Sequence, residues 1–463
     1  MNKKSLMILW LTITASLGGL LFGYDTAVIS GTLSMVRLQF GLNAALEGWY
    51  VSSALVGCII GVSFAGWLSD KNGRKKVLLL AATLFLVSAI GCSLISSFST
   101  LVLYRLLGGM GVGIASMLSP MYISEIAPPK IRGKLVALYQ FAITIGILFS
   151  FFINAWLLNQ STLNDFFINN KLTFIFKTEV WRAMLGMESI PAIIFFLLVL
   201  LVPESPRWLI IKGNIKRAKQ TLVKTIGESD AIIEIKDVQE SLETEKKSKN
   251  LILSPGIKLA LFLGVALAVL QQFTGIDAII YYGPRIMEKA GFGLSDALDS
   301  QVLIGTINML FTLLAIWKID KFGRKPLLLA GTLGMFISLV IIGMLFLINQ
   351  AEGILLLIFI LIFIASFAFS LGPVVWVILS EIYPTRIRGR AMAIATMAVW
   401  IGTAIIGQLI PLSLDNLGPA FTFWIFALFC IPTIWIGWKI MPETKGKTLE
   451  SIEKYWLEKK LRK

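Results

Sequence analysis

Residues 66–75 read GWLSDKNGRK, and residues 316–325 read IWKIDKFGRK. A second pair of segments agrees as well, because SEIAPPKIRG at 124–133 returns as SEIYPTRIRG at 380–389. The two repeats keep their order along the chain, and their offsets are 250 and 256 residues. A near-constant offset of this size indicates that the chain consists of two homologous halves.

Long apolar stretches surround these repeats. Hydrophobic residues make up 56% of the 463 and charged residues only 15%, with a mean hydropathy of +0.81. That composition leaves too little polar surface to coat a soluble protein of this length. Because a helix needs roughly 20 apolar residues to cross a bilayer, the sequence predicts twelve spans. They lie at about 6–31, 48–69, 76–96, 100–122, 134–158, 182–202, 256–283, 298–318, 325–348, 353–380, 389–412 and 418–440.

Basic residues concentrate in four short loops, at 71–76, 130–134, 318–325 and 386–390. The alternate loops carry few of them. Since Lys and Arg accumulate in cytoplasmic loops, both termini are expected in the cytoplasm. The expected fold class is therefore an all-α, multi-pass membrane protein, with twelve transmembrane helices in two pseudo-symmetric six-helix bundles.

One long polar segment of mixed charge separates the halves, and its helical spacing predicts short cytoplasmic helices. It opens with PESPRWL at 203–209, which has a weaker echo in PETKGKTL at 442–449. The expected domains are an N-terminal bundle at 1–202, a helical linker at 203–255, a C-terminal bundle at 256–441 and a cytoplasmic tail at 442–463.

The composition argues against several function classes. The net charge of +15 follows from membrane orientation, and no basic cluster with exposed aromatic residues suggests nucleic acid as a partner. The chain has no histidine, and its three cysteines lie in apolar stretches without CxxC spacing. We therefore expect no metal site, no cofactor and no enzymatic activity. About twenty residues follow the last span, and a membrane sensor would need a longer signalling tail.

Four further motifs are specific in combination: GYDTAVISG at 23–31, PESPR at 203–207, QQFTG at 271–275 and PETK at 442–445. Through them the chain resembles the sugar porter branch of the major facilitator superfamily, over essentially its whole length. Within that branch it is most similar to the bacterial proton–xylose symporters.

The resemblance implies secondary active transport of a monosaccharide (a hexose, a pentose or a related polyol) by alternating access of two rocking halves. Proton-coupled symport is the expected mode, and an energy-independent facilitative uniporter is the alternative. The expected partners are the sugar, protons and the lipid bilayer, with the monomer as the functional unit.

Charged residues of the loop motifs lie at the cytoplasmic ends of neighbouring spans. Pairing across helix ends would brace the inner side while the outer side is open, whereas the alternative makes these charges orientation signals alone. This expected cytoplasmic latch contains Asp70, Arg74, Glu125 and Arg132, repeated as Asp320, Arg324, Glu381 and Arg388. The resemblance adds Glu188, Glu204 and Arg207 to it.

Two charges are predicted inside the membrane. Asp25 lies six residues before Gly31 at the outer end of span 1, and Arg105 lies about five residues into span 4. At ~1.5 Å per residue both lie roughly 8–9 Å below the outer boundary. Because an unpaired charge at that depth is costly, we expect the two to pair. They form either a static bridge or a proton-coupling site. In the resembled branch, the proton–xylose symporters carry Asp at this place and the facilitative glucose carriers carry Asn. This chain carries the Asp, which favours symport.

Polar and aromatic residues at mid-span predict the sugar cavity. Amides can donate to and accept from sugar hydroxyls, and indole rings offer flat faces to a pyranose, although a lone amide also serves as contact between helices. The expected substrate residues, which match ligand positions of the resembled symporters, are Gln140, Gln271, Gln272, Asn308, Trp376 and Trp400. Tyr281 and Tyr282 match their extracellular gate. Gly275 and Gly372-Pro373 are expected to interrupt or soften spans 7 and 10.

Two positions depart from the family pattern. Asp277 replaces the family's Asn, and Val399 replaces a polar residue. We include Asp277 in the substrate set. It is a second titrating group, a specificity residue or a hydrated substitute for the amide. Because polar sites reject analogues that leave groups unpaired, these changes concern which sugar is bound.

Overall fold

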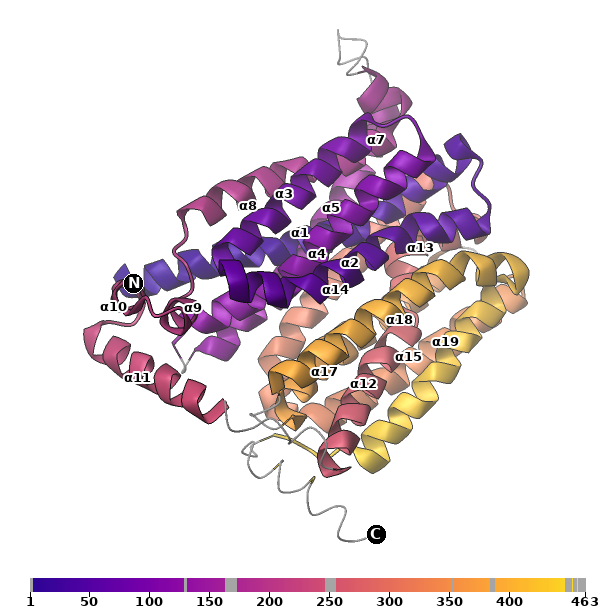
Figure 1. Ribbon diagram of the computed structural model, residues 1–463. Helices are drawn as coiled ribbons and strands as arrows, with labels where there is room; N and C mark the ends of the chain where they lie inside the picture. The colour runs from indigo at the N-terminus through magenta and orange to yellow at the C-terminus, as the bar shows by residue number, and fades with distance from the viewer. Residues whose placement is uncertain are drawn as a thin grey trace. The chain divides into compact units, whose positions relative to one another are not determined.

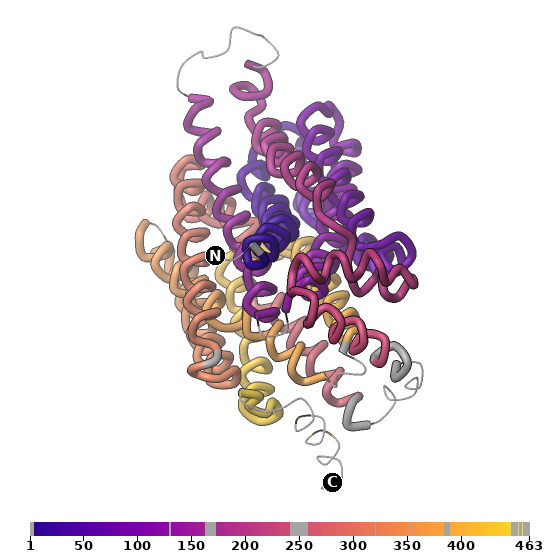
Figure 2. Tube along the Cα trace, turned by 90° about the vertical axis from the view of Figure 1, so that its left-hand side faces the viewer, coloured from indigo at the N-terminus to yellow at the C-terminus, as the bar shows by residue number. Residues whose placement is uncertain are grey.

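The computed structural model describes residues 3–128, 131–162, 173–245, 255–351, 353–383 and 388–445, together with Ile452 and Trp456. Within these ranges it contains helices and no strand. Twelve helical segments are long and apolar enough to cross a membrane, which confirms the predicted spans. The long helices can be followed in Figures 1 and 2.

Each of the first five spans is a single helix, and the sixth is formed by two consecutive helices. They are α1 (Lys3–Phe40), α2 (Ala44–Asn72), α3 (Arg74–Leu94), α4 (Phe98–Ile126), α5 (Arg132–Thr162) and the pair α7 (Val180–Gly186) and α8 (Ser189–Leu201), which follows the short π-helix η1 (Phe174–Thr178). Below, the ends of the spans opposite to the four basic loops are called the outer ends.

The last six spans include two broken ones. They are α12 (Pro255–Phe273) with α13 (Ile276–Lys289), α14 (Leu294–Phe322), α15 (Arg324–Leu347), α16 (Ile354–Phe369) with α17 (Leu371–Ile382), α18 (Arg388–Asn416), and α19 (Gly418–Trp435) with η3 (Ile436–Ile440). In Figure 1, α19 runs beside α15.

The break in span 7 falls at Gly275, as predicted. Gly275 has a left-handed backbone, with φ of 90°, and a Cβ there would lie 2.5 Å from the ring of Phe426. Only glycine meets both conditions without strain. Span 10 breaks at Ser370, two residues before the predicted Gly372-Pro373, because Pro373 fits in the first turn of α17, where no intrahelical N–H bond is needed.

Close approach of helices explains the glycines of α4. A Cβ on Gly109 would lie 1.8 Å from the carbonyl oxygen of Ala54, and one on Gly113 would lie 2.3 Å from that of Cys58. Both carbonyls belong to α2, so α2 and α4 pack backbone to backbone. Small residues at such contacts are the usual basis of helix packing in membranes.

The segment after α8 folds into three short helices, as the spacing predicted. They are α9 (Pro206–Ile211), α10 (Ile215–Thr225) and α11 (Glu228–Glu245), and Figure 1 shows them grouped beyond the end of α8. Ser205 caps α9 by accepting from the N–H of Trp208, and Asn214 caps α10. Their shared core contains Leu209, Ile210, Ala218 and Val238.

Contacts divide the chain into two compact units. Unit 1 comprises Met1–Val28, Ser53–Ser150 and Phe167–Lys249; unit 2 comprises Ile29–Ser52, Phe151–Phe166 and Asn250–Lys463. The repeat in the sequence divides the chain differently, near residue 250, so the predicted domain boundaries stay a prediction. The difference arises because the outer ends of α1, α2 and α5 make their contacts within unit 2.

Candidate functional site

Asp25 on α1 and Arg105 on α4 form an ion pair inside unit 1. The guanidinium Nη1 of Arg105 donates to Oδ1 of Asp25 over 2.7 Å. The side chains are 4% and 3% exposed, so the pair is removed from bulk water. A third charged group, Glu188 at the start of α8, is also buried and interacts electrostatically with both. This buried group therefore contains two acidic side chains and one guanidinium.

Glu188 was expected in the cytoplasmic latch. The structure places it with Asp25 and Arg105 instead, and its Oε1 has no hydrogen-bond partner among the described residues. Only the resemblance to the family assigned Glu188 to the latch. No local pattern in the sequence links this residue to α1 or α4.

A charge cluster joins the ends of α2, α3 and α4 that lie beside the basic loops in unit 1. The Arg74 guanidinium binds both carboxylate oxygens of Glu125, each over 3.1 Å, and also reaches Asp70 over 3.2 Å. Asp70 is 77% exposed, whereas Arg74 and Glu125 are buried. The Arg74–Glu125 pair is therefore the strong member of the cluster.

Glu204, from the PESPR motif, completes this cluster at the start of α3. Its Oε1 accepts from the backbone N–H groups of Arg74 over 2.8 Å and of Lys75 over 3.2 Å. A carboxylate at a helix N-terminus pairs with unsatisfied N–H groups and with the helix dipole. Arg207, by contrast, is exposed at the start of α9 and makes no ion pair with a described side chain.

Arg132 does not pair with Glu125. It lies 3.8 Å from Glu234 of α11 and donates to the carbonyl of Ala127 over 3.4 Å. The reason is that Arg74, at the start of α3, already occupies both oxygens of Glu125.

Unit 2 repeats the cluster almost atom for atom. Arg324 binds Glu381 through two bonds, of 3.1 and 2.9 Å. Glu443 takes the place of Glu204, accepting from the N–H groups of Arg324 over 3.1 Å and of Lys325 over 3.0 Å. Thr444 adds a 2.5 Å bond to Glu381. The side chains of Asp320 and Arg388, also predicted for this cluster, are not among those that the structure describes.

Glu443 was missing from the predicted latch, although the weak echo of PESPR in PETK pointed to it. Partial burial opposes its ionisation, but the backbone N–H groups of Lys445, Arg324, Lys325 and Thr444 outweigh burial and hold the pKa of Glu443 below its ordinary value.

Six of the seven expected substrate residues belong to unit 2. Gln271 and Gln272 lie in the last turn of α12, and the other four lie on later helices of the same unit. Asp277, Asn308 and Trp400 are buried and Trp376 is half-buried, on α13, α14, α18 and α17 respectively. The seventh, Gln140, is half-buried on α5 and belongs to unit 1.

Gln271 connects the two broken spans. Its Nε2 donates to the carbonyl of Leu371 over 2.8 Å, at the first residue of α17. Its Oε1 is buried and has no hydrogen-bond partner among the described residues. Buried polar atoms are normally paired, so this acceptor can take a donor from outside the described residues.

Asp277 is a second such group. Its carboxyl group lies beside the side chains of Thr403 and Tyr281, and Oδ2 is buried without a hydrogen-bond partner in the described part of the chain. The Thr403 hydroxyl donates to the carbonyl of Val399 over 3.0 Å. The neighbouring Tyr282 donates to the carbonyl of Gly407 over 2.6 Å and so ties α13 to α18. Both tyrosines of the expected gate are buried in these contacts.

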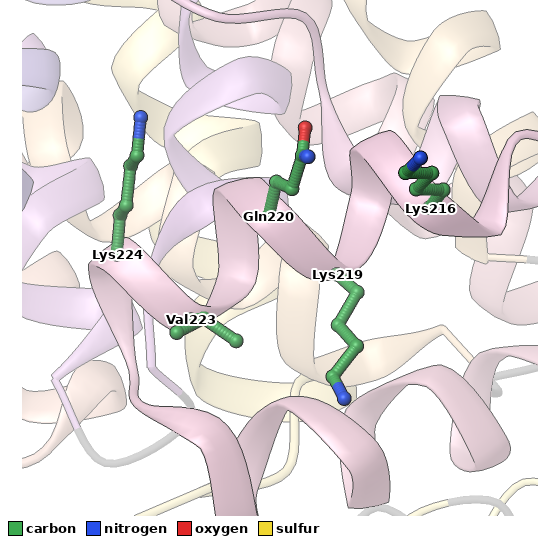
Figure 3. A pocket seen from close by; sticks show the side chains of 5 residues that line it. All are labelled: Lys216, Lys219, Gln220, Val223 and Lys224. Atoms are coloured by element: carbon green, nitrogen blue, oxygen red, sulfur yellow. The ribbon is translucent and has the colours of Figure 1, made fainter.

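Other features lie apart from these residues. A hollow over α10 is lined by Lys216, Lys219, Gln220, Val223 and Lys224, with Lys219 pointing away from the other two lysines (Figure 3) and pairing with Glu228 over 3.2 Å. It contains none of the predicted site residues. Within the described ranges, no group of three or more Cys, Asp or Glu side chains is arranged to hold a metal ion.

Comparison with known proteins gives matches over nearly the whole chain. The family described as "Sugar (and other) transporter" matches residues 11–456. The arabinose–proton symporter of Bacillus subtilis is 41% identical, covering 97% of this chain and 95% of its own. The D-xylose–proton symporter of Escherichia coli is 40% identical, covering 98% and 96%.

Solved structures agree with these matches. An inward-open conformation of the xylose transporter XylE from E. coli has a TM-score of 0.83 and 39% identity, covering 97% of this chain and all of its own. XylE bound to 6-bromo-6-deoxy-D-glucose has a TM-score of 0.81. The predicted major facilitator fold is therefore confirmed, and the chain belongs to the sugar transporter family of that superfamily.

Proposed function

We propose that this protein is a proton-coupled symporter that carries a monosaccharide into the bacterial cell by alternating access. The observation that supports coupling is the buried pair of Asp25 and Arg105. Relatives at 41%, 40% and 36% identity are named as proton symporters of arabinose, xylose and galactose. These names span pentoses and hexoses, so the substrate class is a monosaccharide or a related polyol.

The coupling step follows from the cost of buried charge. A carboxylate and a guanidinium removed from water are stable while they remain paired, and loss of one charge leaves the other uncompensated. Protonation of Asp25 from the outside neutralises the carboxylate and frees Arg105. Glu188 is the adjacent carboxylate that then interacts with the released guanidinium. Proton binding thereby changes which groups α4 contacts, and the loaded carrier can reorient.

Sugar binding is assigned to the residues around the breaks of spans 7 and 10, together with Gln140 of unit 1. Gln271 Oε1 and Asp277 Oδ2 are unpaired buried acceptors, and sugar hydroxyls are donors of the kind they lack. Trp376 and Trp400 contribute ring faces. Tyr281 and Tyr282, on the outer half of the same span, act as the gate.

The charge clusters at Arg74 and Arg324 act as the cytoplasmic latch. Each arginine joins the starts and ends of three helices, so the cluster has to break when those ends separate. Both termini are assigned to the cytoplasm because the basic loops lie on that side. We assign the bacterial inner membrane as the location and the monomer as the functional unit.

A facilitative uniporter is the second candidate. The relatives named as a glucose transporter of Staphylococcus epidermidis and a glucose transport protein of Synechocystis are 38% and 37% identical, and those names include no proton. In this alternative the Asp25–Arg105 pair is a permanent bridge between α1 and α4.

Uptake by the purified protein in liposomes separates the two. We expect one or more of the labelled pentoses and hexoses to accumulate above equilibrium when the vesicle interior is alkaline, and to equilibrate without a gradient. Equal uptake with and without the gradient would establish the uniporter. No uptake of any sugar in the panel, by protein that remains folded, would refute sugar transport.

A further inference from the structure

Five charged residues meet at the outer ends of the spans, opposite to the cytoplasmic latch. This outer cluster consists of Arg37 on α1, Glu47 on α2, Arg285 and Lys289 on α13, and Asp415 on α18. All five belong to unit 2. In sequence, however, α1 and α2 are part of the first half, whereas α13 and α18 are part of the second. The cluster thus connects the two repeats at the outer side.

Its centre is the pair of Glu47 and Arg285. Nη1 of Arg285 donates to Oε1 of Glu47 over 2.5 Å, and the side chains are 3% and 0% exposed. Nη2 of Arg285 also binds both oxygens of Asp415, over 3.0 and 2.9 Å. Arg37 approaches the other oxygen of Glu47 to 3.6 Å, and Lys289 binds Asp415 over 2.9 Å. Arg285 therefore holds α2 and α18 at once.

Neutral contacts close the same junction. Gln408 of α18 donates to the carbonyl of Ala45 over 3.0 Å and accepts from Ser52 over 2.7 Å, both on α2. Ser34 of α1 donates to Glu288 of α13 over 2.7 Å. A Cβ on Gly48 would lie 2.5 Å from the carbonyl oxygen of Gln408, so α2 and α18 are in direct backbone contact.

We infer that Glu47 and Arg285 form an outer charge latch, which holds the carrier closed on its outer side and must break each time that side opens. The inference rests on the proposed alternating access. A buried ion pair can separate at modest cost only where water hydrates both charges, which requires an opened outer junction. The closed state alone therefore contains the pair, and removal of either partner destabilises that state selectively.

The geometry makes a sharp distinction between single and double variants. Glu47→Gln removes the fully buried partner of Arg285 and leaves it with Asp415, whose side chain is 32% exposed. Arg285→Gln leaves the buried Glu47 with Arg37, 3.6 Å away and 44% exposed. Each single change thus leaves a buried charge with only its more exposed partner in the closed state. The double variant Glu47→Gln/Arg285→Gln removes both buried charges, and two amides can still hydrogen-bond. If the residues act as a pair, the effects of the single changes will not add.

The test is the outer accessibility of a cysteine at position 52. Ser52 is buried against Gln408 when the junction is closed, and the three native cysteines are buried. The Ser52→Cys protein in liposomes is treated with a membrane-impermeant thiol reagent from outside. We expect Glu47→Gln and Arg285→Gln each to raise the labelling rate by on the order of tenfold, which corresponds to a modest shift in the equilibrium. The double variant should exceed neither single variant.

Asp296→Asn is the matched control, because it neutralises an exposed carboxylate in the first turn of α14 at the same outer side. It should leave labelling unchanged. Unchanged labelling in both single variants, or an effect in the double variant equal to the product of the singles, would overturn the latch. If a single variant does not fold, Asp415→Asn replaces it, since it removes the half-exposed partner of Arg285 and should raise labelling by a smaller factor; no rise there would also overturn the latch. The labelling readout needs no sugar, so failure of transport and failure of the latch are separate results.

Discussion

Replacement of Asp25 by Asn should abolish energy coupling while leaving a folded carrier. In the native protein the 2.7 Å bond from Arg105 ends on a carboxylate that is 4% exposed. Removal of one partner from a buried pair typically costs about 3–5 kcal/mol, because a charge is left without compensation. Here Asn keeps an oxygen acceptor at the same place, and the Glu188 side chain belongs to the same buried group. The loss of stability should therefore stay below that range.

The transport effect can be given a size. A membrane potential of 100 mV supplies about 2.3 kcal/mol per proton, so symport of one proton per sugar can concentrate the sugar roughly 45-fold. Asp25→Asn has no proton to exchange at this site, and the expected final ratio is about 1. Sugar counterflow, which needs binding and reorientation but no gradient, should persist.

The assay is uptake of the labelled sugar into liposomes at an imposed potential and proton gradient, followed to its plateau. Asp296→Asn is the control, because it neutralises an exposed carboxylate in the first turn of α14 that has no part in the proposed coupling step. If Asp25→Asn vesicles still reach a plateau well above 1, the pair is a structural bridge, and protons enter elsewhere or not at all.

Four further predictions follow from the site and the latches. Arg74→Ala should slow reorientation and shift the carrier toward inward-open states with sugar affinity unchanged; identical turnover and accessibility would make these charges orientation signals. Gln272→Ala and Trp376→Ala should each weaken sugar binding several-fold, since each contact contributes about 1 kcal/mol, and calorimetry giving native affinity would place that residue outside the cavity. Asp277→Asn should change the order of affinities across a sugar panel, and an unchanged order would make the carboxylate a simple substitute for an amide. Because the pKa of Glu443 is lowered, its bonds are fully formed above the unfolded value of about 4.3 and are lost only as the pH falls through the lower folded value. The difference in melting temperature between the native protein and Glu443→Gln should therefore be constant from pH 5 to 7.5, and a difference that shrinks within that window would contradict the assignment.

The spans and their order could be predicted from hydropathy because each is a local property of about twenty residues. The break at Gly275 was predictable for a similar reason, since a glycine follows a polar pair within one helix. The break at Ser370 was displaced from Pro373 because a proline is tolerated in a first turn, which composition alone does not reveal.

Pairings between helices were predictable only where depth or repetition restricted them. Matched depth was enough for Asp25 and Arg105. Depth alone did not identify the partner of Glu125, which binds Arg74 because the start of α3 lies nearer than the start of α5. It also did not place Glu188, which packing between helices brings close to Asp25 and Arg105. Glu47 and Arg285 are separated by 238 residues and belong to no repeat, so no pattern in one sequence links them.

The helix α1 crosses the boundary between the two units without interruption, from Lys3 to Phe40. It carries Asp25 on one side of that boundary and Arg37 on the other, twelve residues or about 18 Å farther along the same axis. A single uninterrupted helix thus links the group proposed to take the proton to the junction proposed to close the outer side. If the release of Arg105 tilts α1, the helix itself would carry the movement to Ser34 and Arg37. Flexibility introduced into α1 between residues 25 and 37 should then uncouple its two ends even with every ionisable group intact.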